Sequence, residues 1–221
     1  MCIVVTGFEP FGGERINPSW EAVCRLPDFI GTRRLVRCQL PVVYQTCADG
    51  LIQVLRREKP EAVLCVGQAG GRTGITPEWA ALNRMHAKSP DNAGVIATHQ
   101  PIRAEGESAY FSTLPVAEMV ERMRAEGIPA SASYHAGTYV CNALFYRLMC
   151  YLHENNENIP AGFIHVPYAC EQICREEKAA ASLPLSVLVR GIELCLTAVE
   201  QSLPAYSSDH ADAAPAPAPE A

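Results

Sequence analysis

The sequence predicts an α/β protein whose central sheet is covered by helices on both faces. Two observations lead to this prediction. Short, continuously apolar runs such as residues 2–6 and 62–66 are typical of strands that are buried on both sides. Segments in which apolar residues recur at helical spacing separate these runs. Strands that alternate with helices along a chain favour a sheet between two helical layers.

The elements of the N-terminal half follow from local signals. A helix is expected to begin at Asn17, a suitable N-cap, with Pro18 in its first position. A second helix ends at Lys59-Pro60, because proline cannot continue a helix. The expected order is strand 2–6, helix 17–26, strand 34–40, helix 46–58 and strand 62–66.

Glycine-rich loops follow two of these strands, at residues 7–13 and 67–74. In open α/β sheets, ligands bind outside the carboxyl ends of the strands. Phe8 and Phe11 in the first loop are either ligand-binding rings or core residues. Glu78, just after the second loop, lies among apolar neighbours, so it is either buried and functional or exposed at an edge. Neither loop contains a nucleotide-binding pattern.

The C-terminal half continues the alternation after a long interruption. Residues 86–110 show poor periodicity, and a loop of this length is usually functional or involved in assembly. From Pro204 onward, alanine and proline dominate, and such a segment cannot bury enough surface to become ordered. We therefore expect one domain over 1–204 and a disordered tail over 205–221. The expected elements are helix 115–126, strand 130–134, helix 142–153, strand 162–168 and helix 185–203.

Composition excludes several classes of protein. The 221 residues are 48% hydrophobic and 19% charged, which suits one globular domain with a sizeable core. The net charge is −6 and Lys and Arg do not cluster, so a nucleic-acid partner is not expected. No apolar run is long enough to span a membrane, and the first residues lack a signal-peptide pattern. The ten cysteines are therefore expected to be reduced thiols of a cytoplasmic protein.

Cys141 lies where a glycine-containing turn leads into the helix predicted for 142–153. A helix N-terminus lowers the pKa of a thiol and favours the nucleophilic thiolate. The alternative is that Cys141 is one more buried, small hydrophobic residue. A cysteine nucleophile needs a base and a group that orients the base, and His165 and Glu78 are candidates for these roles.

His165 also allows a structural interpretation, because a histidine in a buried strand is often a core residue. Cys170 and Cys174 follow it four residues apart. A zinc site there would need a further pair of ligands, and none is visible, so no metal is predicted.

Six ordered blocks, spread over roughly residues 1–200, give the chain a resemblance to the pyroglutamyl peptidase I family, also called pyrrolidone-carboxylate peptidases. The blocks are residues 6–13 with Asn17-Pro18, 67–72 with 75–78, 90–92, 109–115, 136–142, and 162–168 with 171–172. The resemblance implies a cysteine peptidase that hydrolyses the amide bond after an N-terminal pyroglutamyl residue through a thioester. It implies that Cys141 is the nucleophile, that His165 is its base and that Glu78 orients His165.

The resemblance also implies the substrate-binding residues, the fold, the assembly and the partners. Phe8 and Phe11 would sandwich the lactam ring, Asn17 and the backbone of Gln68 would bond its polar atoms, and Val140 would line the same site. The implied fold is a three-layer α/β/α sandwich with a central, mostly parallel mixed sheet. The implied assembly is a homotetramer without metal or cofactor, and the implied partners are peptides with a pyroglutamyl N-terminus.

Two positions depart from the family pattern. Trp79 follows Glu78 where the family usually has arginine, and Lys88 stands where an arginine usually lies close to the active site. Arginine and lysine are not interchangeable where a planar guanidinium is used. Two alternatives therefore stay open: a related hydrolase with a different lactam or amide substrate, and a weakly active binding protein of the same fold.

Overall fold

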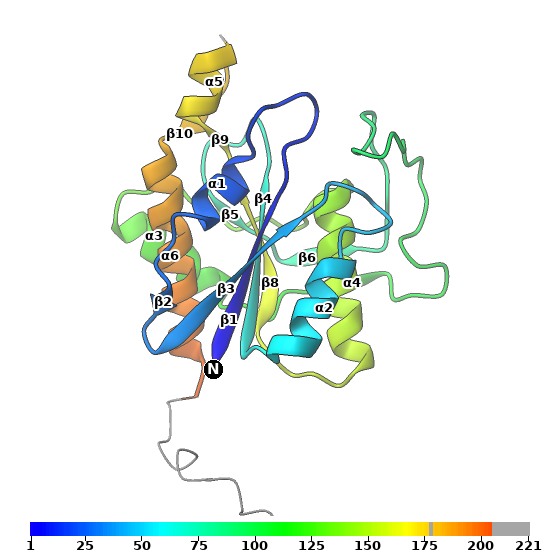
Figure 1. Ribbon diagram of the computed structural model, residues 1–221, viewed down its shortest axis with the longest axis horizontal. Coiled ribbons are helices and arrows are strands. Elements are labelled where there is room, and N and C mark those ends of the chain that lie inside the picture. The colour runs from blue at the N-terminus through cyan, green and yellow to red at the C-terminus, as the bar shows by residue number, and fades with distance from the viewer. Residues whose placement is uncertain (177–178, 205–221) are drawn as a thin grey trace, which may run out of the picture.

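A six-stranded sheet in the order β2-β3-β1-β4-β8-β5 runs through the middle of the molecule (Figure 1). The computed structural model describes residues 1–176 and 179–204, so the tail predicted for 205–221 lies outside the described residues. Neighbouring strands among β3, β1, β4 and β8 are parallel, and β2 and β5 are antiparallel edges. The strands are β1 (Cys2–Phe8), β2 (Phe29–Ile30), β3 (Arg33–Leu40), β4 (Ala62–Gln68), β5 (Thr76–Pro77) and β8 (Ala161–Val166).

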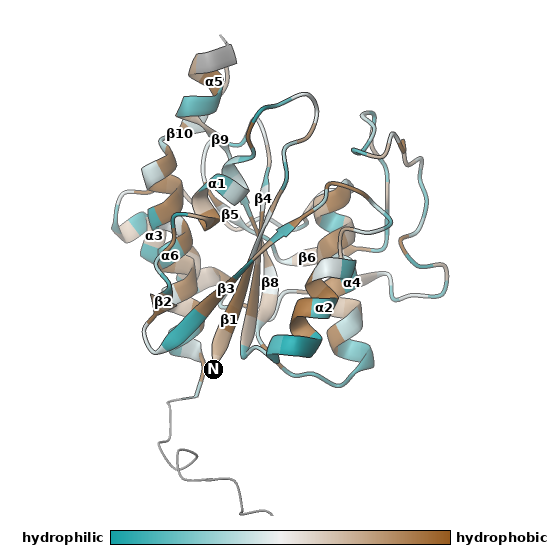
Figure 2. Ribbon diagram, in the orientation of Figure 1, coloured by the Kyte–Doolittle hydropathy of each residue, from teal (hydrophilic) through white to brown (hydrophobic). Residues whose placement is uncertain are grey.

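Helices cover both faces of this sheet, which confirms the predicted α/β class (Figure 1). One layer consists of α2 (Asp49–Glu58) and α4 (Val140–Glu154), and the other of α1 (Pro18–Val23), α3 (Val116–Ala125) and α6 (Leu185–Ser202). Each layer packs on its own apolar cluster. Strand β1 serves both clusters, because alternate side chains point to opposite faces: Val4 joins one cluster and Val5 the other. Figure 2 shows the resulting hydrophobic strands and inner helix faces.

The sequence did not predict the shortest elements. The two-residue edge strands β2 and β5, two small sheets and one helix carry too few residues for a periodic signal. The small sheets are β6 (Ala80–Leu82) with β7 (Ala109–Phe111) and β9 (Tyr168–Ala169) with β10 (Ser182–Leu183), and the helix is α5 (Cys170–Glu176).

The strand predicted for 130–134 is wrong. Within this segment, Ala130 and Ser133 make only isolated bridges to Ile75 and Glu78. Pro77 provides the physical reason, since it lies midway along this pairing and has no N–H group to donate. The ladder of hydrogen bonds is therefore interrupted at that position, and residues 130–134 lie beside β5 without forming a strand.

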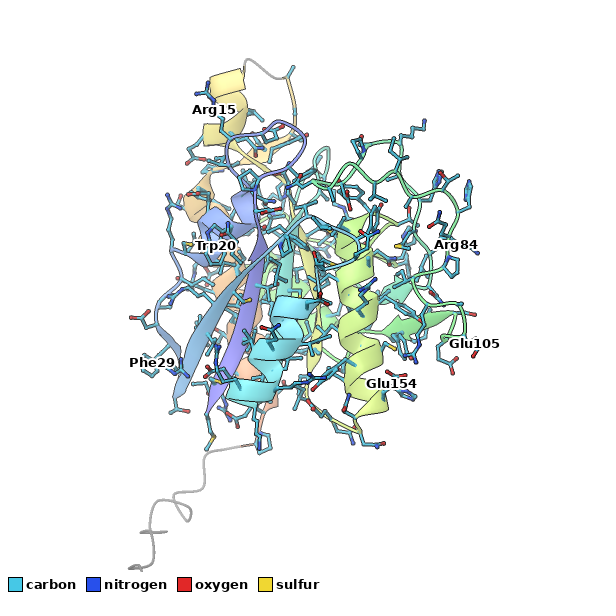
Figure 3. All side chains as sticks on the ribbon, turned by 45° about the vertical axis from the view of Figure 1, so that its right-hand side comes forward. Arg15, Trp20, Phe29, Arg84, Glu105 and Glu154 are labelled. Carbon is cyan, nitrogen blue, oxygen red and sulfur yellow. The ribbon has the colours of Figure 1, made fainter. Side chains whose placement is uncertain are left out.

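The loop expected over 86–110 carries no helix or strand as far as residue 108, but its last two residues belong to β7, and side chains fix the segment 86–108. Asp91 accepts from the backbone N–H of Tyr44 at 2.9 Å. Asn92 donates to Glu9 Oε1 at 2.8 Å. Figure 3 shows the segment on the outer side of α4, where Arg84 and Glu105 lie at or close to its ends. These contacts explain why the block at 90–92 matters: it attaches the long segment to the loop after β1.

Two further expectations concern the whole chain. All ten cysteines fall in the described ranges, and each is a free thiol. Among the described helices, none has the length and hydrophobicity needed to cross a membrane.

The sheet opens between β1 and β4, and this opening positions the candidate site. Strand β1 pairs with β3 as far as Phe8, but its pairing with β4 stops at Thr6 and Cys65. The carboxyl ends of β1 and β4 therefore diverge, with Phe8 on one side and Gln68 on the other. After β1 the chain forms β3 on one side of β1 and then β4 on its other side. The gap between β1 and β4 is therefore the topological switch point, which is where α/β sheets bind ligands.

Candidate active site

Cys141 is the second residue of α4, close to its predicted place at a helix start. Tyr139 is the N-cap and makes no capping hydrogen bond with its side chain, so N–H groups of the first turn are available to an anion. Asn142 fixes this turn: its side chain accepts from the Leu82 N–H and donates to the Leu82 carbonyl, both at 2.8 Å. The helix start is thus tied to the segment that follows Glu78.

Gly67 brings the thiol close to the sheet. A β-carbon at position 67 would lie 2.9 Å from Cys141 Sγ and 2.7 Å from a ring carbon of Phe163. Only glycine permits an approach this close. Gly67 pairs with His165 across β4 and β8, so the thiol lies over the strand position beside His165.

Glu78 is fully buried, which decides between the two interpretations left open by the sequence. Its Oε1 lies 2.6 Å from His165 Nδ1. The backbone N–H of Glu78 donates to the Phe163 carbonyl at 2.9 Å, which holds the residue against β8. A second donor, Arg72 Nη1, reaches the same oxygen at 2.6 Å. Sequence reasoning missed Arg72, although a buried carboxylate calls for a cation and Arg72 closes the preceding glycine-rich loop.

The charges of the pair follow from its surroundings. Burial raises the pKa of Glu78, but the hydrogen bonds and charges around the carboxylate, first from His165 and then from Ser133 and Arg72, together outweigh burial and hold that pKa below its ordinary value. Burial lowers the pKa of His165 and outweighs the opposing effect of Glu78. At neutral pH, Glu78 is therefore ionised and His165 neutral. The carboxylate only accepts, so Nδ1 carries the proton and Nε2 keeps a free lone pair.

The predicted lowering of the Cys141 pKa is wrong for this free protein. Burial raises the pKa of the thiol to about 12, and Cys47 and Glu78 act in the same direction. The positive charge of Arg72 and a backbone hydrogen bond lower it, but by less. Desolvation thus outweighs the helix start. The resting site pairs a protonated thiol with a neutral imidazole, which is the arrangement for general-base activation of the thiol.

A small pocket lies at the switch point, with Cys141 in its wall. No charged side chain is among its lining residues. It is lined by Phe8, Phe11, Asn17, Val42, Gln68, Tyr139, Val140 and Cys141.

The structure thus brings all five predicted substrate-binding residues to one pocket and adds Val42 and Tyr139. Phe8 is both a core residue and a pocket residue, since it is 2% exposed and packs 6.4 Å from the Phe163 ring. Phe11 is less buried and packs 6.0 Å from the Tyr139 ring. Tyr139 lies two residues before Cys141, and this proximity is the signal that could have identified it.

Asn17 has one polar hydrogen left for a ligand. Its Oδ1 accepts from the N–H and hydroxyl of Ser19, at 3.1 and 2.8 Å, as an N-cap does. Its Nδ2 donates to the Glu9 carbonyl at 2.9 Å. An amide nitrogen carries two hydrogens, so the second one can serve a ligand in the pocket.

The two departures from the family pattern lie outside the pocket lining. Lys88 is exposed and lies two residues before Pro90, whose carbonyl accepts from the Tyr139 hydroxyl at 2.8 Å. No contact of Lys88 itself with the pocket is seen, so the closeness of Lys88 to the active site stays a prediction. Trp79 is 37% exposed, and its backbone N–H donates to the Ser133 carbonyl at 2.7 Å. Across residues 1–176 and 179–204, no three potential metal ligands gather closely enough to hold an ion.

A thiol at a helix start, a neutral imidazole on the adjacent strand position and a carboxylate behind it define a hydrolase of the cysteine type. A sequence profile described as pyroglutamyl peptidase matches residues 1–202. The chain belongs to the pyroglutamyl peptidase family.

Relatives and solved structures agree with this assignment. The chain is 46% identical over 199 residues to a pyrrolidone-carboxylate peptidase of Streptococcus pyogenes, which covers 90% of this chain and 92% of the relative. The crystal structure of Bacillus amyloliquefaciens pyroglutamyl peptidase I superposes with a TM-score of 0.86 at 42% identity, over 90% of this chain and 96% of that one. A mutant pyrrolidone carboxyl peptidase from Pyrococcus furiosus gives 0.87 at 34% identity, over 92% and 100%. The two alternatives to a peptidase are thus not favoured.

Proposed function

We propose that this protein removes pyroglutamyl residues from the N-termini of peptides, with Cys141 as nucleophile, His165 as base and Glu78 as the group that orients His165. One observation carries the proposal: the small, uncharged pocket has the Cys141 thiol in its wall. A neutral lactam ring suits this pocket, and its exocyclic carbonyl carbon would then lie beside the thiol. The aromatic rings of Phe8 and Phe11 offer apolar walls for the ring.

The reaction proceeds in two steps. His165 Nε2 accepts the thiol proton while Cys141 Sγ attacks the carbonyl carbon that follows the lactam. The tetrahedral intermediate collapses, the C–N bond breaks, and His165 gives the proton to the leaving amine. His165 then takes a proton from water, the hydroxide displaces Sγ from the thioester, and the proton returns to the thiol. N–H groups of the first turn of α4, including that of Cys141, would bind the oxyanion.

Selectivity for the lactam follows from hydrogen bonds that other rings cannot make. The free Nδ2 hydrogen of Asn17 would serve the lactam carbonyl, and the backbone of Gln68 would serve the lactam N–H. Proline lacks that carbonyl and would leave a buried donor unpaired, and glutamate would bring charges into an uncharged pocket. We therefore expect pyroglutamyl amides to be hydrolysed at least about 10³-fold faster than prolyl or glutamyl amides, measured as kcat/KM.

An Asn17→Asp variant tests the hydrogen bond. Aspartate keeps the oxygen that caps α1, so the helix is retained, but it removes both Nδ2 hydrogens, including the one donated to the Glu9 carbonyl, and adds a negative charge to the pocket lining. We expect kcat/KM for a pyroglutamyl amide to fall roughly 10–100-fold, as for the loss of a buried hydrogen bond. Unchanged kcat/KM in a folded variant would show that Asn17 does not bind the lactam.

The pH dependence follows from the state of the resting site. His165 must be neutral to accept the thiol proton, and burial places its pKa below the ordinary 6.5. The acid limb of kcat/KM should therefore have its midpoint below 6.5, with activity lost as the pH falls through the lowered pKa of His165. Rates on a pyroglutamyl amide over about pH 5–9 measure this. A midpoint above 6.5 would contradict a His165 base whose pKa burial lowers.

The homotetramer, the cytoplasmic location and the tail over 205–221 stay predictions of the sequence. The same holds for the absence of a metal or cofactor.

A further inference from the structure

Arg72 lies behind the candidate catalytic residues, on the side of Glu78 away from the substrate pocket. Its Nη1 donates to Glu78 Oε1 at 2.6 Å and also to the hydroxyl of Thr76. Thr76 is the register partner of His165 across β5 and β8. The guanidinium therefore contacts two groups next to His165. One is the Glu78 carboxylate, which bonds the imidazole, and the other is Thr76, which lies opposite His165 on the neighbouring strand.

The shared oxygen is the central feature of this arrangement. Glu78 Oε1 receives Arg72 Nη1 and His165 Nδ1 at the same distance of 2.6 Å. A carboxylate oxygen has two lone-pair sites, so two donors from different directions fix both the rotation of the carboxylate and the direction of its bond to the imidazole. Without Arg72, Oε1 would lose one of these two donors, and the direction of its bond to the imidazole would be less firmly fixed.

The same guanidinium is reachable from outside. Arg72 is about one-quarter exposed, at 26%, whereas Glu78 is fully buried. Arg72 lines an open cleft together with Gly71, Thr73, Gly74 and Arg124, and this cleft shares no lining residue with the pocket that contains Cys141. Arg124 donates to the Ala130 carbonyl at 2.8 Å instead of contacting Glu78. The cleft thus offers a second arginine as a matched control.

We propose that Arg72 is a positioning residue of this peptidase: it clamps Glu78 Oε1 against His165 Nδ1 and so holds His165 in the orientation and tautomer that activate Cys141. The inference rests on the proposed function and deepens it. Arg72 is absent from the lining of the pocket proposed for the lactam ring and contacts Glu78, so it acts on His165 through Glu78.

Electrostatics give the clamp a measurable signature. The charged groups that face His165 are Glu78, which raises its pKa, and Arg72, which lowers it. Cys141 is affected by Cys47 and Glu78, which raise its pKa, and by Arg72, which lowers it. Removal of Arg72 should therefore move the acid limb of kcat/KM to higher pH and leave less thiolate at a given pH.

The first experiment compares Arg72→Ala with Arg124→Ala on a pyroglutamyl amide. For Arg72→Ala we expect kcat to fall about 10–100-fold, the loss typical of outer-shell partners, with KM nearly unchanged and the acid limb shifted to higher pH. Guanidinium ion at a non-denaturing concentration should enter the open cleft and restore part of kcat. Arg124→Ala should resemble the wild type throughout. Unchanged kcat, or a lower kcat with an unchanged pH profile and no rescue, would overturn the proposal.

A second readout does not depend on the substrate. Iodoacetamide alkylates thiolates, and mass spectrometry of the peptide that contains Cys141 follows its alkylation alone. In Arg72→Ala this rate should be lower than in the wild type at the same pH, and an unchanged rate would contradict the clamp. If the wild type did not hydrolyse pyroglutamyl amides, the proposed function would fail while this rate still tested the role of Arg72.

Arg72→Lys covers the case in which Arg72→Ala does not fold. Lysine keeps the positive charge, but its ammonium sits on a flexible chain and lacks the rigid guanidinium plane that holds Nη1 between Glu78 and Thr76. We expect kcat to fall about 10-fold, with an acid limb close to that of the wild type. Full activity of Arg72→Lys would show that charge alone suffices and would overturn the positioning role.

Discussion

A Cys141→Ala variant is expected to release no measurable amine from a pyroglutamyl amide that the wild type hydrolyses. Alanine removes the only atom proposed to form the thioester, and loss of a nucleophile costs on the order of 10⁴–10⁶ in kcat in comparable hydrolases. The fold should tolerate the change, because the alanine side chain is smaller than that of cysteine and adds no polar group. Release of a chromogenic or fluorogenic amine by the two proteins, side by side, provides the measurement.

Cys24→Ala is the matched control for this experiment. Cys24 is the exposed C-cap of α1 and contributes nothing to the pocket lining. Its replacement removes a thiol elsewhere, so full activity is expected. Residual turnover by Cys141→Ala at more than a small fraction of the wild-type rate would assign the nucleophile to another group. Absence of turnover by reduced, folded wild type would contradict the proposed activity itself.

Glu78 should show the second-largest effect, and its size should depend on the replacement. Glu78→Ala removes the oxygen shared by His165 Nδ1 and Arg72 Nη1. His165 then loses the partner that fixes its tautomer, and kcat should fall about 10⁴-fold. The unfolding free energy should also fall, by roughly 1–3 kcal/mol, because buried donors are left unpaired.

Glu78→Gln should be much milder, about 10²–10³-fold in kcat. The glutamine oxygen can replace Oε1, because Arg72 and His165 both donate to that position, so the tautomer is retained. The negative charge that supports the imidazolium is lost. Glu78 raises the pKa of His165, so the acid limb of kcat/KM should move to lower pH in this variant.

Kinetics and thermal unfolding of the two variants show whether Glu78 acts through its hydrogen bond to His165 or through its negative charge. Equal losses of kcat in Glu78→Ala and Glu78→Gln would mean that only the charge matters, against the shared-acceptor arrangement. Near-wild-type kcat in Glu78→Ala would remove Glu78 from the mechanism altogether. Arg124→Ala is again a suitable control, since it changes a charged side chain in a neighbouring cleft without touching Glu78.

Local patterns in the sequence determined the larger elements. Continuous apolar runs are long enough to specify β1 and β4, and the signals at Asn17-Pro18 and Lys59-Pro60 locate helix ends to within a few residues. The turn that precedes α4 placed Cys141 at a helix start. These features depend on residues close in sequence, which is why a single sequence contains them.

Only the tertiary structure decided what depends on contacts between distant segments. The predicted strand 130–134 is reduced to two bridges because it lies beside residues 75–78, where Pro77 cannot donate a hydrogen bond. Residues 130–134 alone do not reveal that Pro77 is their neighbour. The meeting of Arg72, Glu78 and His165 requires the glycine-rich loop, the sheet edge and β8 to come together. The thiol pKa shows the same limit: the local helix start favours a thiolate, but burial among distant side chains raises the pKa of Cys141. Desolvation is a property of the packed interior, and no local pattern of residues encodes it.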